Sequence, residues 1–412
     1  MTKVAVAMLG ARRHYAVPRL LHEAGVLHRF FTDSYIGNKP WMEAVIGGIP
    51  PAIRPAALAR WLGRNSDALP PEKVISFEKL GLWYVWSLKR ARSAAETQAV
   101  FVAMASRFNQ LVVEHGIGES DIVWGFNGAS LGLFKDAKSI GRRCVLEQTS
   151  NPKPIERALA AEEHKRWRDW ISDQQKASSE PERDEGEAEE WKLADRIVAG
   201  SKFVADGLIS EGVDQSKVSV LPYGVDLDRF AWVGRPSFSQ QRPLRVLFVG
   251  RVSIMKGVPY LLDALKGLGP KSVQAHFVGN VAIDSLQLDA FRCVAKFLGP
   301  IARSSMLEHY QWADVFCFPS ITEGSAAVTY EALATGLPVI TTRNAGSIVR
   351  DEVDGFVVPI RSSNKLAEAL HRYVEDPTIL TAHQEQLRDG RERAGLERYK
   401  NDLVHVIRGF KY

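Results

Sequence analysis

Two glutamates eight positions apart, Glu323 and Glu331, bracket the segment best suited to binding a polar ligand. Apolar residues 314–320 before them predict a buried strand, and an apolar pattern of helical spacing runs on to Gly336. Glu323 is therefore expected in a loop, with Glu331 about two turns into a helix, roughly 9–12 Å further on. Free amides at the start of such a helix suit a phosphate. They belong to Gly324, Ser325, Ala326 and Ala327.

This spacing fits a ligand that carries hydroxyl groups on both sides of a diphosphate, as a sugar nucleotide does. Two solvated glutamates on a helix would give the same spacing. A second segment strengthens the first interpretation: residues 244–250 predict a central strand, and Arg251 and Lys256 follow in its loop. Open α/β sheets bind ligands at the carboxyl ends of their strands. Arginine forks onto phosphate, and lysine acts as a point charge.

Together these segments resemble the C-terminal half of GT-B-fold retaining glycosyltransferases of family 4, also called glycosyl transferases group 1. The order and spacing fit throughout residues 190–360, whereas the N-terminal third resembles the family only in general layout. The matching segments are residues 194–201, 221–230, 249–257, 298–300, 318–320, 323–331 and 346–359.

The resemblance implies an α/β protein of GT-B type, with two doubly wound Rossmann-like domains and an interdomain cleft. The alternation of strand and helix signals along the chain independently indicates parallel sheets covered on both faces. We expect an acceptor-binding domain at residues 1–230 and a nucleotide-sugar-binding domain at 231–390. A C-terminal helix at residues 391–412 is expected to cross back to the first domain. The expected strands are residues 4–9, 29–32, 121–126, 144–148, 196–199, 218–221, 244–249, 275–278, 296–298, 315–318, 338–341 and 356–358.

The resemblance also implies roles for single residues. Arg251 and Lys256 correspond to the cations that bind the donor diphosphate, and Glu323 to the residue near the donor sugar; these three are the predicted catalytic residues. Glu331 corresponds to the residue that accepts hydrogen bonds from the ribose. The remaining predicted donor-binding residues are Gly10 in the first glycine loop, Leu298 at the base pocket, and Gly324, Ser325 and Ala326.

The function that follows is retaining transfer of a sugar from a nucleotide-activated donor to an acceptor hydroxyl, in glycan, glycolipid or polysaccharide biosynthesis. The expected donor is a UDP or GDP sugar, and no other cofactor is expected. No paired aspartates suggest a metal site, and the two cations with a helix N-terminus supply positive charge instead. A sugar-nucleotide epimerase on the same scaffold is the alternative, and a non-catalytic partner subunit is a third hypothesis.

One departure from the family concerns the strand at residues 121–126. A histidine often follows it in the family, but Asn127 stands near that place here. Glu147, after the next strand, and His14, in the first glycine loop, are candidate acceptor-side groups. A lone glutamate or histidine in a loop is more often an ordinary surface residue.

Composition agrees with a globular enzyme of 412 residues, 45% of them hydrophobic and 25% charged. A net charge of +5 is too small to indicate a nucleic-acid partner. Three scattered cysteines, no signal peptide and no apolar run of about 20 residues predict a cytoplasmic protein. Residues 41–64 and 83–92 mix apolar and basic side chains, which predicts either peripheral contact with the inner membrane face or packing within the protein. For residues 83–92, aromatic side chains lining an acceptor groove are a further alternative.

Two further expectations concern segments outside these motifs. The acidic segment 178–190 is expected to be a solvated loop or a frayed helix start. Residues 384–410 are expected to form one long, highly charged helix, and residues 230–243 to link the two domains.

Overall fold

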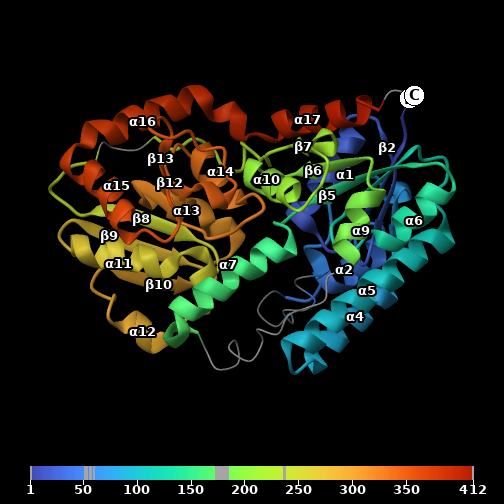
Figure 1. The fold of residues 1–412 in the computed structure, drawn as a ribbon, viewed down its shortest axis with the longest axis horizontal. Coiled ribbons are helices and arrows are strands. Elements are labelled where there is room, and N and C mark those ends of the chain that lie inside the picture. The colour runs from blue at the N-terminus through green and yellow to red at the C-terminus, as the bar shows by residue number, and fades with distance from the viewer. Residues whose placement is uncertain are drawn as a thin grey trace.

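The computed structural model describes residues 2–50, 54, 58, 61–171, 185–234 and 238–410. The described strands form two fully parallel sheets, each flanked by helices (Figure 1). The first sheet has the order β3-β2-β1-β4-β5-β6-β7 and the second β10-β9-β8-β11-β12-β13. The predicted α/β fold class, with two doubly wound Rossmann-like domains, is confirmed.

The strands are short and mostly buried, because helices cover both faces of each sheet. In the first sheet they are β1 (Val4–Met8), β2 (Leu27–Thr32), β3 (Val74–Ser76), β4 (Ile122–Phe126), β5 (Arg143–Gln148), β6 (Arg196–Ala199) and β7 (Val218–Val220). In the second they are β8 (Leu244–Val249), β9 (Val273–Val278), β10 (Ala295–Gly299), β11 (Val315–Phe318), β12 (Val339–Thr342) and β13 (Gly355–Val358).

The helices connect these strands in the alternating order typical of the fold. Those before β8 are α1 (Ala16–Glu23), α2 (Pro40–Gly47), α4 (Glu78–Arg90), α5 (Ala94–His115), α6 (Leu131–Ser139), α7 (Lys153–Arg166), α9 (Glu185–Leu193) and α10 (Lys202–Ser210). Those after it are α11 (Val258–Leu268), α12 (Ser285–Asp289), α13 (Met306–Trp312), α14 (Ala327–Ala334), α15 (Ser363–Glu375), α16 (Pro377–Gly390) and α17 (Leu396–Arg408). Among the described helices, none is long and apolar enough to cross a membrane.

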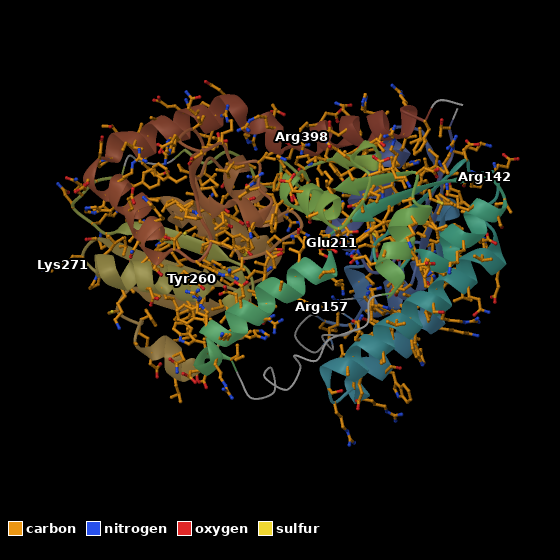
Figure 2. All side chains as sticks on the ribbon, in the orientation of Figure 1. Arg142, Arg157, Glu211, Tyr260, Lys271 and Arg398 are labelled. Atoms are coloured by element: carbon orange, nitrogen blue, oxygen red, sulfur yellow. The ribbon has the colours of Figure 1, made fainter. Side chains whose placement is uncertain are left out.

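The C-terminal segment consists of two helices, where one long helix was expected. The chain between α16 and α17 pairs with the end of the first domain: Val225 N donates to the carbonyl oxygen of Ala394 (2.8 Å), and Leu396 N to that of Val225 (3.1 Å). This long-range pairing interrupts the helix at Gly395. Helix α16 lies over the second domain, and α17 lies over the first and packs on α1 (Figure 1). Figure 2 shows Arg398 near the start of α17, where it donates to the carbonyl oxygen of Pro222 (2.6 Å).

Helix α7 precedes β6 in the chain but packs against the second domain. Its Glu163 carboxylate accepts from Tyr260 (2.9 Å) and Arg361 (2.5 Å) of that domain. Two tryptophans just beyond it continue the contact, with Trp167 5.3 Å from the Tyr260 ring and Trp170 5.8 Å from that of Phe291. Tyr260 is labelled beside α7 in Figure 2. The segment from Lys153 to Trp170 is therefore a strut between the domains.

The structure describes the two segments that mix apolar and basic residues, 41–64 and 83–92, to different extents. Much of residues 41–64 lies outside the described part, namely 51–53, 55–57 and 59–60. Residues 83–92 fall mainly on α4, where Trp83 is 39% and Trp86 53% exposed. Core packing is therefore wrong for these two tryptophans, because α4 turns them to solvent.

The expectation that the acidic segment 178–190 is solvated is wrong for two of its residues on α9, Glu187 and Glu190. Glu187 is 4% and Glu190 1% exposed. Their carboxylates accept hydrogen bonds from backbone amides of the first domain, which explains the burial. Residues 178–184 lie outside the described residues, as do 235–237 of the expected linker.

Candidate active site

The loop after β8 carries both predicted cations. Gly250 ends the strand, and Arg251 follows with an exposed side chain. Gly257 has φ +70°, and a Cβ atom there would lie 2.0 Å from the carbonyl oxygen of Pro319. The loop therefore folds tightly onto the end of β11 and needs glycine at this position. That approach brings Lys256 to Glu323, with which it forms a partly buried ion pair.

The loop between β11 and α14 holds the predicted phosphate-binding amides. Helix α14 begins at Ala327 and ends before Gly336, which has φ +76°. Ala326 N donates to the carbonyl oxygen of Ala345 (3.0 Å), so the prediction that its amide is free is wrong. The amides of Gly324, Ser325 and Ala327 donate to no described residue. Three amides therefore remain at the N-terminus of α14, where they can meet an anion.

Glu331 lies in the middle of α14 and is mostly buried. Its carboxylate accepts a hydrogen bond from Tyr310 (2.8 Å). Burial raises the pKa of Glu331, and the Tyr310 hydrogen bond and the nearby cations Arg303 and Arg229 oppose that effect. Glu323 and Glu331 thus occupy different surroundings: the first pairs with a cation in the loop, and the second accepts from a neutral hydroxyl beside the helix.

No contact is found between Leu298 or Gly10 and the other predicted site residues that the structure describes. Leu298 is 38% exposed near the end of β10, and a Cβ atom on Gly10 would meet nothing within 4 Å. Gly10 N donates to the Asp33 carboxylate (2.7 Å). The chain directly after Gly10 takes left-handed φ angles of 47° at Arg13 and 50° at His14, an unusual conformation for these residue types.

Of the two acceptor-side candidates of the first domain, the structure contradicts Glu147, whereas His14 stays a prediction. Glu147 is fully buried, and it pairs with Arg13 (2.6 Å) and accepts from Trp124 (3.1 Å), so its proposed place at the acceptor side is wrong. The pKa of His14 falls to about 4 because of burial and three surrounding arginines, which keeps the ring neutral. Arg13 was missed by the sequence analysis; its guanidinium also donates to Tyr399 (2.8 Å) and ties β1 to α17.

The first domain meets the loop between β11 and α14 (residues 319–326), called the donor loop after its predicted role, through residues 149–151. A Cβ atom on Gly324 would lie 1.8 Å from the carbonyl oxygen of Thr149. Asn151 donates from Nδ2 to Thr322 Oγ1 (3.0 Å) and to the carbonyl oxygen of Glu323 (3.2 Å). Asn127, at the position where the family often carries histidine, accepts from Thr149 N (3.0 Å) and Oγ1 (2.8 Å). Asn127 therefore positions the segment that touches the donor loop.

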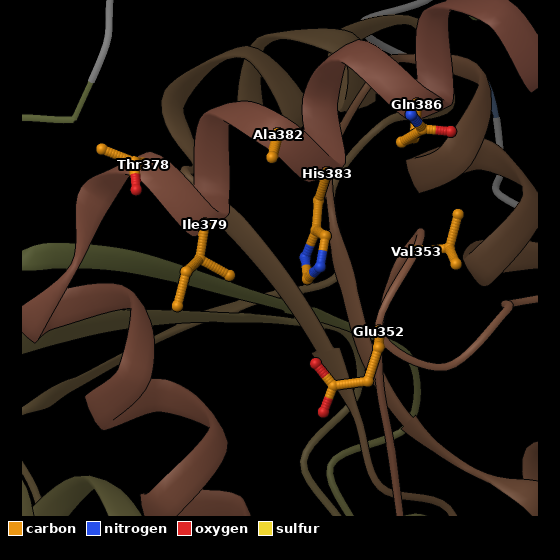
Figure 3. Close-up of a pocket in the computed structure, with 7 residues that line it drawn as sticks. All are labelled: Glu352, Val353, Thr378, Ile379, Ala382, His383 and Gln386. Atoms are coloured by element: carbon orange, nitrogen blue, oxygen red, sulfur yellow. The ribbon is translucent and has the colours of Figure 1, made fainter.

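Two of the hollows lined by described residues are large enough for a small organic molecule. One of about 910 Å³ lies in the first domain between α5, α6 and α9, and reaches Thr149 and Ser150. The other, of about 590 Å³, lies beneath α16 and is lined by His383 and Glu352 (Figure 3). Its polar groups are already engaged, because His383 bonds to Tyr373 (2.8 Å) and Glu352 pairs with Arg372 (2.7 Å). None of the predicted site residues lines either hollow, but the first includes Thr149 and Ser150, which contact Gly324. The first hollow is therefore the one that adjoins the candidate site.

Across the part of the chain that the structure describes, no group of three or more His, Cys, Asp or Glu side chains is arranged to hold a metal ion. The predicted cations Arg251 and Lys256 both lie in the loop after β8, and Lys256 reaches the donor loop through its ion pair with Glu323.

Sequence comparison finds known relatives for part of the chain. Residues 243–376 match the family Glycosyl transferases group 1. A D-inositol 3-phosphate glycosyltransferase of Geodermatophilus obscurus is 32% identical over 221 residues, which is 48% of this chain and 49% of that protein. One from Xylanimonas cellulosilytica is 30% identical over 196 residues, 42% and 47% of the two chains. The chain thus spans about half the length of these relatives.

Solved structures share the whole fold at lower identity. HepE of Anabaena, solved in complex with UDP-glucose, superposes with a TM-score of 0.62 at 14% identity and covers 100% of both chains. Sucrose-phosphate synthase of Thermosynechococcus elongatus gives a TM-score of 0.62 at 19% identity and 99% coverage of each chain. The chain therefore has the GT-B fold and carries a glycosyl transferases group 1 sequence in its second domain, which confirms the predicted resemblance.

Proposed function

We propose that this protein is a retaining glycosyltransferase that moves a sugar from a nucleotide-activated donor to an acceptor hydroxyl. The observation that carries the proposal is the arrangement around α14: the Lys256–Glu323 pair lies at the loop that carries three amides without described acceptors, and exposed Arg251 lies in the same loop as Lys256. Positive charge and oriented amides suit a departing diphosphate. The relatives named as glycosyltransferases and the neighbour solved with UDP-glucose support a nucleotide-sugar donor.

The Lys256–Glu323 pair suggests how donor binding prepares the site. A diphosphate would attract Lys256 and compete with Glu323 for its ammonium group. The Glu323 carboxylate, released from that pair, could then accept hydrogen bonds from hydroxyl groups of the transferred sugar. Glu331 would hold the ribose on the other side of the α14 N-terminus. The diphosphate, the transferred sugar and the ribose then each have a separate contact in the protein. In this arrangement the anomeric carbon faces the first domain.

We further propose that transfer retains the anomeric configuration without a metal ion. The acceptor oxygen attacks the anomeric carbon from the face that the diphosphate leaves. The glycosidic bond to phosphate breaks as the new one forms, and the acceptor proton passes to a phosphate oxygen. Arg251, Lys256 and the α14 N-terminus stabilise the leaving diphosphate, the charge role that a metal has in other transferases. Glycan, glycolipid or polysaccharide synthesis would use this reaction.

A donor panel tests this function. UDP-, GDP- and ADP-sugars would be added separately and thermal unfolding followed; a ligand at 100 times its Kd stabilises the native state by about 2.7 kcal/mol. A UDP sugar is expected to raise the unfolding temperature of the wild type more than that of Lys256→Ala. No shift with any donor would contradict the proposal. Incubation with donor alone separates the epimerase alternative, because only an epimerase would convert the donor to an isomer.

Helix α4 offers a surface for peripheral contact with an anionic membrane. It exposes Leu82 (56%), Trp83 (39%) and Trp86 (53%), with Lys89 and Arg90 in its last turn. Aromatic side chains beside cations suit the headgroup region of such a surface. Flotation with vesicles containing phosphatidylserine should recover the wild type and lose a Trp83→Ser, Trp86→Ser double variant. Equal flotation of both proteins would refute this contact.

A further inference from the structure

The hollow of about 910 Å³ in the first domain combines an apolar wall with a polar end. The wall comes mainly from one face of α5 and from α6, through Phe101, Val102, Ala105 and Leu131. Val102 is 55% exposed, and Ser106 beside it is also exposed, so the hollow opens to solvent along α5. Its volume is in the range of sites for small organic molecules, about 300–1,000 Å³.

The polar end of the hollow adjoins the proposed donor site. Thr149 and Ser150 line it, and these are the residues against which Gly324 of the donor loop packs. Arg12 lines the same end and donates to Thr149 Oγ1 (3.0 Å). A molecule in the hollow would therefore have one end within the first domain and the other beside the loop that carries Glu323.

Charge in the hollow is balanced. The cations on its lining are Arg12, Lys135 and Lys153, and the carboxylates are Asp136, Glu187 and Glu190. Glu187 and Glu190 are almost fully buried at the polar end, where they accept from the amides of Lys153 (3.0 Å) and Ser130 (2.7 Å). Burial raises the pKa of Glu190 to about 7, and the acidic groups on the lining equal the cations in number, so the hollow offers no surplus of positive charge to a phosphate group. The lining therefore matches an uncharged molecule better than the phosphorylated compound for which the sequence relatives are named.

We propose that this hollow is the acceptor site and takes an uncharged, amphipathic acceptor. An alkyl or aryl group would lie against the α5 wall, with the reacting hydroxyl presented beside Thr149. The proposal rests on the proposed glycosyltransferase function for the transfer step only. Binding of such a molecule to the hollow is a separate property and is measured separately.

The binding experiment uses octyl β-D-glucoside below its micelle concentration, with methyl β-D-glucoside as the short analogue and octyl β-D-glucoside 6-phosphate as the charged one. Ser106→Trp would fill the hollow from an exposed position on α5. Ala103→Trp is the matched control, because Ala103 is exposed on the same helix and does not line the hollow. Calorimetric titration of the full chain with UDP present measures binding.

We expect the octyl compound to bind about 100-fold more tightly than the methyl compound, because burial of roughly three to four methylene groups gives that ratio. Ser106→Trp should weaken octyl glucoside binding at least about tenfold, while Ala103→Trp leaves it unchanged. Equal binding of octyl and methyl glucosides would overturn the proposal. Tighter binding of the 6-phosphate, or undiminished binding to Ser106→Trp, would overturn it as well.

Transfer then distinguishes the two proposals. If the octyl compound binds as expected and becomes glycosylated when donor is added, both the hollow as acceptor site and the proposed function are supported. If it binds to the hollow while a bound UDP sugar is never transferred to it, the acceptor assignment is overturned. Failure of every nucleotide sugar to bind, with octyl glucoside binding intact, would instead overturn the proposed function.

Discussion

Gly324→Ala tests whether the contact between the two domains forms the working site. A Cβ atom at this position would lie 1.8 Å from the Thr149 carbonyl oxygen and 2.6 Å from its carbon, whereas ordinary contact begins at 3.4 Å. Backbone on both sides must therefore separate by about 1.6 Å to remove the overlap. Because a misplacement of about 1 Å at a catalytic site can cost a factor of about 100, we expect turnover to fall by about that much.

The fold should tolerate this substitution better than the reaction does. Overpacking at one contact costs about 1–3 kcal/mol, which a two-domain chain of this size can absorb. Gly267→Ala is the control, because a Cβ atom there meets nothing within 4 Å. Transfer rates at saturating donor, together with thermal unfolding of each variant, give the comparison. Normal turnover in Gly324→Ala would show that the Thr149 contact is not part of the reacting arrangement.

Four further outcomes follow from the site. Arg251→Ala and Lys256→Ala should each lower turnover by about 10²–10³ with the fold intact, and near-normal turnover in either would remove that residue from the mechanism. Glu331→Gln should mainly raise the KM for donor, and Glu323→Gln should mainly lower kcat. The reverse pattern in steady-state kinetics would mean that the donor binds in the opposite orientation. Transfer should persist in EDTA, and loss restored by Mn²⁺ would refute a metal-free reaction. Burial, with Glu187 and Glu323 nearby, raises the pKa of Glu156 to about 7, so the folded protein loses stability as pH rises from about 4.5 to 7. Glu156→Gln should therefore raise the unfolding temperature at pH 8 and change it little at pH 4.5, and equal shifts at both values would contradict this cause.

Strands, helices and loops whose limits depend on the residues close by in the sequence could be predicted. The strands at residues 196–199 and 244–249 have the expected limits, because buried runs of β-branched and aromatic residues end at charged or glycine neighbours. The Glu323 loop and the Glu331 helix are also found as expected. Strand β3, Val74–Ser76, was missed because three residues at a sheet edge give too short a pattern.

Features decided by long-range partners could not be predicted in this way. In the sequence, Glu147 is a carboxylate near the end of a strand, which suggests a group that faces a ligand. In the structure, the left-handed turn after Gly10 brings Arg13 into an ion pair with it. Glu187 and Glu190 belong to an acidic run that normally indicates solvent exposure. Their burial depends on backbone amides from segments about 60 and 34 residues away, which no local pattern reveals.

The strut formed by α7 links the donor and acceptor sides of the site. Glu163 and Trp167 hold its far end on the second domain, whereas Lys153 at its start donates to Glu187 and lines the hollow in the first. Rotation of one domain against the other must therefore strain either the Tyr260 contact or the Lys153 contact. Because Asn151, just before the strut, also bonds to the Glu323 loop, the same rotation alters the donor loop. We therefore expect donor binding at Lys256, as proposed above, to change the shape of the hollow through residues 149–153.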